Sequence, residues 1–154
     1  MHICILEFLI NSKGFNNLEK IKKSISVVLI DDSPLTHLIV EKALESMEMA
    51  ILLSHVYNGE EFVELVKRTK PDIAILDIEM TGIDGFTAME SARRHHPELK
   101  VIFLSQYNTA GFVKTAYSLK ANGFLVKMPE VEFLRNALLR VMSGEFVLDN
   151  SLQN

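Results

Sequence analysis

Along most of this chain, short apolar runs alternate with longer stretches in which apolar residues recur every three or four positions. The short runs are rich in Val, Ile, Leu and Phe and lack polar alternation, which is typical of strands covered by helices on both faces. They predict strands at residues 26–31, 51–56, 72–77, 100–105 and 123–127. The longer stretches predict helices at residues 33–48, 59–69, 85–95, 109–120 and 130–143. This alternation is typical of βαβ units, and it predicts an α/β fold in which a parallel sheet lies between two layers of helices.

Local signals support the helix assignments. Ser33 before Pro34 is typical of a helix N-cap followed by proline at the first helical position, and Asn58-Gly59 indicates a turn before the second helix. The apolar residues of the first helix have helical spacing and are expected in the core: Leu35, Leu38, Ile39, Ala43 and Met47. The last helix has one apolar face, made by Phe133, Leu134, Ala137, Leu138 and Val141.

The chain length of 154 residues favours a single domain. We expect residues 25–146 to form it, after an N-terminal extension at 1–24 and before a C-terminal tail at 147–154. Residues 3–10 are nearly all apolar, but this run is far shorter than the ~20 residues that span a bilayer. It is expected to be an extra helix or strand, or the product of an upstream start codon. The alternative is a segment that docks on the domain or on a second chain.

Charge and cysteine content limit the classes of function. The formal net charge of −4 argues against non-specific binding to nucleic acid, which needs a basic surface. The single cysteine, Cys4, excludes an internal disulfide and fits a reducing compartment. No secretory signal is indicated, since neither a positive region nor a small-residue cleavage site flanks the apolar run. We therefore expect a cytoplasmic protein that binds no membrane and, by this chain alone, no nucleic acid.

Acidic residues occur where two predicted strands end. Asp31 and Asp32 follow the first strand, and Asp77 ends the third. The carboxyl ends of parallel strands meet at one edge of a sheet, and three carboxylates there repel each other unless a hard divalent cation lies among them. The pattern predicts a Mg²⁺ site with Asp77 as a carboxylate nucleophile for phosphoryl transfer. The backbone carbonyl of Glu79 could add an oxygen ligand.

Two more polar side chains are predicted at the same edge. Ser105 ends the fourth strand and Lys127 ends the fifth. The ammonium group of Lys127 can pair with a phosphate oxygen, and the hydroxyl of Ser105 can donate a hydrogen bond to another. The predicted site therefore contains three carboxylates, one hydroxyl and one ammonium group.

Five short motifs carry these groups in a fixed order: Asp31-Asp32; Leu76-Asp77-Ile78-Glu79-Met80 with Gly82 and Asp84-Gly85; Leu104-Ser105; Gly123-Phe124-Leu125-Val126; and Lys127. Together they resemble the receiver domain of two-component response regulators, and the resemblance covers residues 26 to about 143. It implies a flavodoxin-like (βα)5 three-layer sandwich with a five-stranded parallel sheet in the strand order 2-1-3-4-5.

The resemblance also implies a role for each group: phosphorylation of Asp77, Mg²⁺ binding by Asp31 and Asp32, phosphoryl contact by Lys127, and switching by the hydroxyl of Ser105 and the ring of Phe124. In the family the hydroxyl moves toward the phosphate and the aromatic ring turns inward behind it. This movement would repack the face formed by residues 109–120, 123–127 and 130–143.

The chain departs from the family pattern at three places. Thr81 stands where a proline is frequent, and Gln106 and Tyr107 follow the switch hydroxyl where a small residue is common. Gln106 and Tyr107 are therefore expected to bear on how long a phosphoryl group stays on Asp77 and on the access of phosphodonors. Because Met128 separates Lys127 from Pro129, we expect no cis peptide bond at Lys127. This offset, with Ser143-Gly144-Glu145-Phe146, resembles receivers that usually precede a helix-turn-helix output domain.

The remaining polar residues of note are expected to have no separate function. His37 and His55 have no partners at ligand spacing and are expected at the surface or partly buried. The pair His95-His96, before Pro97, is expected at a solvated helix end. Asp84 is expected to be a turn or cap residue and not a metal ligand.

These observations predict a receiver that accepts a phosphoryl group on Asp77 from a histidine kinase or a histidine phosphotransfer protein and then changes a protein-interaction face. The downstream target is not identified. No enzymatic activity is expected beyond its own phosphoryl transfer and dephosphorylation. A homodimer is possible through the face that the switch repacks or through the N-terminal segment.

The alternatives to this function are the receiver of a helix-turn-helix transcriptional regulator and a pseudo-receiver that needs no phosphorylation. A phosphatase of the haloacid dehalogenase type is disfavoured, because Glu79 stands where that class has a second Asp.

Overall fold

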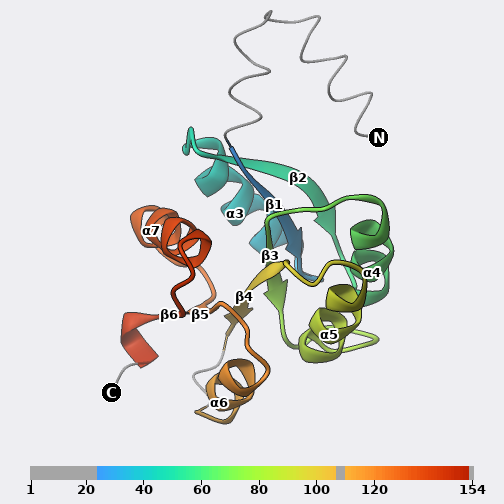
Figure 1. Cartoon of the computed structure of the whole chain (residues 1–154). Coiled ribbons are helices and arrows are strands. Elements are labelled where there is room, and N and C mark those ends of the chain that lie inside the picture. The colour runs from blue at the N-terminus through green and yellow to red at the C-terminus, as the bar shows by residue number, and fades with distance from the viewer. Residues whose placement is uncertain (1–23, 107–109, 153–154) are drawn as a thin grey trace, which may run out of the picture.

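The computed structural model describes residues 24–106 and 110–152. The strands are β1 (Ile25–Ile30), β2 (Ala50–Val56), β3 (Ile73–Asp77), β4 (Lys100–Ser105), β5 (Gly123–Val126) and β6 (Val147–Leu148). The helices are α3 (Pro34–Glu45), α4 (Gly59–Arg68), α5 (Gly85–His95), α6 (Ala110–Ser118) and α7 (Val131–Met142), followed by the short 3-10 helix η1 (Asn150–Leu152). The strands form one sheet in the order β2-β1-β3-β4-β5-β6, and all neighbours are parallel (Figure 1).

Two apolar layers form the core, one on each face of the sheet. Leu29 and Ile75 pack with residues of α3 and α7, whereas Ile30 and Phe103 pack with residues of α4, α5 and α6. Successive strand residues point to opposite faces, so the neighbours Leu29 and Ile30 belong to different layers, and both are fully buried. The predicted three-layer α/β fold is confirmed.

The number of strands differs from the prediction, because the sheet has six strands and not five. The sixth lies in the segment expected to be a tail: Val147 pairs with Gly123 of β5, and Leu148 pairs with Phe124. A strand of two residues is too short to give a periodic pattern. Its position is fixed instead by tertiary contacts, since the Val147 side chain is fully buried in the layer beneath α7.

The buried face of α3 agrees with the prediction only in part. Ala43 and Met47 are buried as expected, but Leu35 and Leu38 are 55% and 53% exposed. The face that packs on the sheet also carries Thr36, His37, Val40 and Leu44. Two polar residues thus occupy inward positions, which is why a search for apolar spacing selected Leu35 and Leu38 in their place.

The helix starts follow the predicted cap chemistry. The Asn58 side chain accepts a hydrogen bond from the backbone N–H of Glu61 at 2.8 Å, and the Asp84 side chain accepts one from Thr87 at 2.8 Å. Asp84 is thus a cap residue, as expected. Among the described residues there is no cis peptide bond, in agreement with the expectation for Lys127.

Candidate functional site

Parallel pairing brings the predicted polar residues to one edge of the sheet. Asp77 is the last residue of β3, which lies between β1 and β4, and Asp31 directly follows β1. Ser105 is the last residue of β4 and lies opposite Val126 of β5, so that Lys127 comes next. Four strands therefore contribute to one site at their carboxyl ends.

The three carboxylates form a compact cluster. Asp31, Asp32 and Asp77 each offer an oxygen atom, and these atoms all lie within 4.8 Å of one another. Asp31 is fully buried and Asp77 is 4% exposed, whereas Asp32 is exposed. The cluster can therefore be reached from solvent on the side of Asp32.

Lys127 is the cation of the site. Its Nζ lies 3.0 Å from Oδ2 of Asp31 and 3.1 Å from Oδ2 of Asp77. Burial alone would lower the pKa of Lys127, but its close ion pair with Asp31 and the charge of Asp77 outweigh this effect and raise the pKa. The lysine is therefore charged at neutral pH and holds the two buried carboxylates together.

Asp77 is destabilised as an anion. Burial and the charge of Asp31 raise the pKa of Asp77 to about 6, although Lys127 and the backbone N–H of Glu79 act in the opposite direction. That N–H donates to Oδ1 of Asp77 at 3.3 Å. A single ammonium group thus does not fully compensate two neighbouring carboxylates.

The donor set fits a hard divalent cation. Oδ2 of Asp31 is buried and accepts no hydrogen bond of good geometry among the described residues, so its partner there is the ion pair with Lys127. A carboxylate oxygen with spare acceptor capacity, beside two other carboxylates, is the environment that Mg²⁺ prefers. A surface cavity of about 570 Å³, lined in part by Asp32, Glu79 and Thr81, lies next to this cluster and leaves room for a ligand.

The two predicted switch residues lie further inside. Ser105 is 2% exposed, and its backbone carbonyl accepts a hydrogen bond from the N–H of Lys127 at 2.8 Å. Phe124 is fully buried and belongs to the layer beneath α5 and α6. Gln106 is exposed, and Tyr107 lies outside the described residues, as do residues 1–23 of the predicted extension.

One contact at the site was not predicted. His37 is 3% exposed, not at the surface, and its Nε2 lies 2.7 Å from the backbone carbonyl oxygen of Asp31. His55 is partly buried, as expected, but it does have a partner, because its Nδ1 lies 2.7 Å from Nδ1 of His37. The sequence signal was weak: a histidine six residues after Asp31 becomes informative only once it is known to face the sheet.

A second unpredicted feature is the reason for Gly85 at the start of α5. A Cβ atom added there would lie 2.3 Å from the backbone oxygen of Asp77. The N–H of Gly85 donates to the carbonyl of Ile78 at 2.8 Å. The loop after β3 thus folds back tightly onto the backbone of the acidic site, and only a residue without a side chain permits this approach.

Several known proteins are similar to this chain. It is 30% identical over 127 residues to the nitrate/nitrite response regulator protein NarL of Escherichia coli, covering 82% of this chain and 59% of the relative. It is 27% identical over 130 residues to a homologous regulator of Haemophilus influenzae, covering 84% of this chain and 62% of the relative. The chain thus spans less than two thirds of the length of these relatives, which are response regulators and not classical enzymes.

Solved structures show the same fold. The receiver domain of the putative response regulator NarL from Mycobacterium tuberculosis is 28% identical, with a TM-score of 0.75, and the match covers 80% of this chain and 99% of that one. The isolated receiver domain of RcsB from Salmonella enterica, determined with the phosphomimetic BeF3⁻, is 23% identical, with a TM-score of 0.77 and coverage of 84% and 96%. These matches support the flavodoxin-like receiver fold.

The described helices include none that is long and apolar enough to cross a membrane.

The family model of the response regulator receiver domain matches residues 27–139, which include every residue of the site at the carboxyl edge of the sheet. This chain therefore belongs to the response regulator receiver domain family of two-component systems.

Proposed function

We propose that Asp77 is the residue that accepts a phosphoryl group, in a Mg²⁺-dependent reaction with a histidine kinase or a histidine phosphotransfer protein. The observation that carries this proposal is the position of Asp77: it ends the central strand β3, lies in a cluster with Asp31 and Asp32, and is 3.1 Å from the ammonium group of Lys127. This is the set of groups that a carboxylate nucleophile for phosphoryl transfer needs.

Each side chain of the site then has a chemical task. A carboxylate oxygen of Asp77 attacks the phosphorus atom, the bond to the donor nitrogen breaks, and the electron pair returns to the imidazole of the donor. Asp32 and Asp77, with Asp31 directly or through water, would hold the metal, and the carbonyl of Glu79 would add a ligand. Bound Mg²⁺ offsets the negative charge that develops on the phosphoryl oxygens. Lys127 exchanges one carboxylate partner for a phosphoryl oxygen.

The proposed output is a change in the face formed by α6, β5 and α7. The hydroxyl of Ser105 would move to donate a hydrogen bond to a phosphoryl oxygen, and the ring of Phe124 would turn inward behind it. This face would bind a downstream protein or a second copy of the chain. We infer that the domain acts on no separate substrate, and that it works in the cytoplasm, where its family members meet the kinase domains that phosphorylate them.

A helix-turn-helix regulator is the second candidate for the whole protein. The observation in its favour is that the chain matches 59–62% of the length of response regulators related to NarL, and that RcsB, a protein of the same fold, has been solved in complex with DNA. In that case the output would be dimerisation and DNA binding by another domain, and not by this one. A receiver that signals without phosphorylation is the remaining alternative.

Intact mass measurement tests the proposal. The full chain is incubated with acetyl phosphate and Mg²⁺, and we expect a mass gain of one phosphoryl group that is absent with EDTA. Asp77→Asn should show no gain, whereas Asp84→Asn, which changes an acidic cap on the same loop, should retain it. An equal gain in wild type and Asp77→Asn, or none in wild type, would contradict the proposal. Function that persists in Asp77→Asn in the native host would favour the phosphorylation-independent alternative.

A further inference from the structure

A buried histidine of α3 touches the acidic cluster and has no task in the chemistry above. His37 faces the sheet, is 3% exposed, and places Nε2 2.7 Å from the carbonyl oxygen of Asp31. A carbonyl group only accepts hydrogen bonds, so Nε2 is the donor and carries a proton. The histidine therefore provides a hydrogen-bond donor for the carbonyl group of Asp31, a residue that is fully buried.

This contact completes a set of restraints on Asp31. Its N–H donates to the carbonyl of Val56 in β2 at 3.1 Å, and its Oδ1 accepts from the N–H of Ser33 at 2.7 Å. Its carbonyl group is held by His37. That carbonyl shares one rigid peptide plane with the nitrogen of Asp32, so its direction determines how the chain leaves β1. His37 thus fixes the backbone from which the exposed carboxylate of Asp32 extends.

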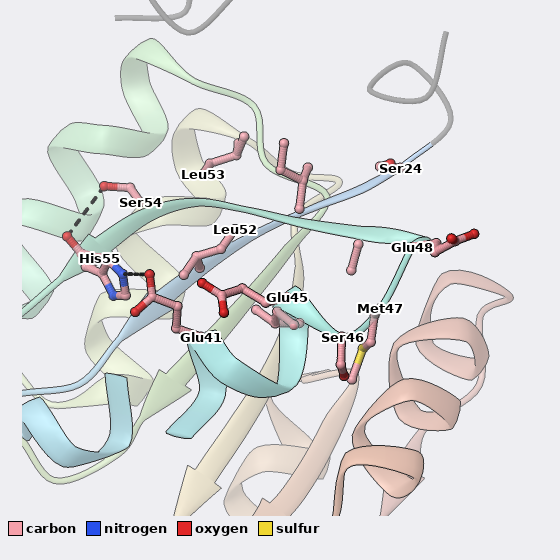
Figure 2. A pocket seen from close by; sticks show the side chains of 13 residues that line it. Ser24, Glu41, Glu45, Ser46, Met47, Glu48, Leu52, Leu53, Ser54 and His55 are labelled. Atoms are coloured by element: carbon pink, nitrogen blue, oxygen red, sulfur yellow. Dashed lines mark hydrogen bonds and ion pairs between the residues drawn. The ribbon is translucent and has the colours of Figure 1, made fainter. Parts of the chain in front are cut away.

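His37 is itself held in one orientation. Its Nδ1 lies 2.7 Å from Nδ1 of His55, whose Nε2 lies 3.4 Å from Oε1 of Glu41. The ring of Tyr57 packs against His37 in a tilted arrangement, with a centroid distance of 4.3 Å and an interplanar angle of 33°. Figure 2 shows His55 and Glu41 facing each other in the pocket along β2. The contacts run from this surface pocket through two imidazole rings to the backbone of Asp31.

Hydrogen-bond donors and acceptors can be assigned along these contacts between the two rings and Asp31. Since Nε2 of His37 donates to Asp31, its Nδ1 is free to accept, and Nδ1 of His55 then supplies the N–H between the two rings. The remaining nitrogen of His55, Nε2, lies against the carboxylate of Glu41. Each ring is thereby bound on both sides, and rotation of His37 would break both of its contacts together.

We propose that His37 is a positioning residue for metal binding, and that it acts by fixing the peptide group between Asp31 and Asp32 with support from His55 and Glu41. The inference rests on the proposed function for the identity of the metal, Mg²⁺. Without the donor, the buried carbonyl of Asp31 loses its partner, and the peptide turns to find another. The carboxylate of Asp32 then leaves the position in which it shares a cation with Asp77.

Two substitutions of similar size separate positioning from folding. In His37→Gln the amide retains an N–H donor that reaches toward Asp31, whereas His37→Leu fills the space without a donor. The full chain is titrated with Mg²⁺ alone, in the absence of any phosphodonor, and binding is followed by NMR at the amides of Asp31 and Asp32. Loss of a residue that orients metal ligands typically weakens metal binding by 10- to 100-fold. We expect about a 10-fold weaker Kd for His37→Leu and a Kd within about 2-fold of wild type for His37→Gln.

A matched control measures the effect of lost stability. Val141→Ala shortens a fully buried side chain of α7 by two methyl groups, far along the chain from the cluster, and should lower Tm without changing the Kd for Mg²⁺. A wild-type Kd in His37→Leu would overturn the inference, as would equal weakening in both His37 variants. Neither result depends on phosphorylation, so the inference and the proposed role of Asp77 can fail separately.

Discussion

At the scale of single residues, the acidic cluster combines opposing demands on charge. Asp31 and Asp77 are buried beside each other with one ammonium group between them, and the pKa of Asp77 is raised to about 6. This is unfavourable for folding at neutral pH in the absence of a cation. A site that binds a divalent ion gains from the same arrangement, because the ion supplies the missing positive charge.

Asp77→Asn should therefore stabilise the metal-free protein at pH 7. The folded-state pKa of Asp77 lies above its unfolded value near 3.8, so the carboxyl group favours the folded state below about pH 4 and this contribution is lost as pH rises through about 6. Removing the charge should raise the free energy of unfolding at pH 7 by about 1–2 kcal/mol, with little change at pH 4. Urea unfolding with EDTA at both pH values measures this difference.

Addition of Mg²⁺ provides the control for this prediction. Saturating Mg²⁺ should stabilise wild type and remove most of its difference from Asp77→Asn, because ligand binding to the folded state raises stability. A variant that is less stable than wild type at pH 7 without metal would show that the pair with Lys127 outweighs the repulsion by Asp31.

Residue types at strand ends could be predicted well, whereas one contact could not. Asp77, Ser105 and Lys127 were placed correctly at the sheet edge because each follows directly from where its strand ends and from the parallel order of the strands. His37 was not, because its partners are a backbone carbonyl and a histidine on β2. Neither contact leaves a periodic signal in the sequence.

At the scale of elements, the loop between β3 and α5 is shaped by close backbone contact. The Asp84 cap begins α5, and Gly85 lies against the backbone of Asp77 and Ile78, the residues that end β3 and follow it. The position of the helix and that of the proposed phosphoryl acceptor are therefore coupled through one glycine.

Gly85→Ala should destabilise the domain and disturb the site. The new Cβ would lie 2.3 Å from the oxygen of Asp77 and 2.9 Å from Cα of Ile78, so backbone must move. We expect a loss of about 2 kcal/mol or more in the free energy of unfolding, together with a weaker Kd for Mg²⁺. The control is Gly111→Ala in α6, where a Cβ meets nothing within 4 Å and the gain in helix propensity should stabilise by up to about 1 kcal/mol. Equal effects of the two variants would exclude the backbone contact as the cause.

The edge of the sheet shows where element prediction fails. β1, β3 and β4 are buried apolar runs, and the sequence located each to within one or two residues. β6 has two residues, and two backbone hydrogen bonds pair it with β5. The N–H of Val147 donates to the carbonyl of Asn122, and the N–H of Asp149 donates to the carbonyl of Phe124. These contacts join segments on opposite sides of α7 in the sequence, so the local pattern carries no information about them.

At the scale of the whole molecule, an aromatic cluster next to the site joins β4 to α5 and α6. The ring of Phe86 in α5 packs against Phe103 in β4 at 4.9 Å and against Phe112 in α6 at 6.0 Å. Phe124 lies opposite Phe103 in the sheet, two residues before the position that faces Ser105. In the proposed mechanism, a shift of the Ser105 hydroxyl would act on a packed core that connects β4 and β5 with α6, and packed cores of this kind move between discrete arrangements.

Ser105→Ala should separate phosphoryl binding from the conformational response. In wild type, Mg²⁺ with beryllofluoride should shift the amide signals of Asp31 and Lys127 at the site and also those of α6, β5 and α7. The variant retains the carboxylates and the lysine, so the signals at the site should still shift. The remote shifts should fall by more than about half, because the hydroxyl that links the ligand to the core is missing. Ser143→Ala, which removes an exposed hydroxyl at the end of α7, should behave like wild type. Full remote shifts in Ser105→Ala would mean that the signal leaves the site by another path, and the loop that contains Gly85 would then be the next segment to test.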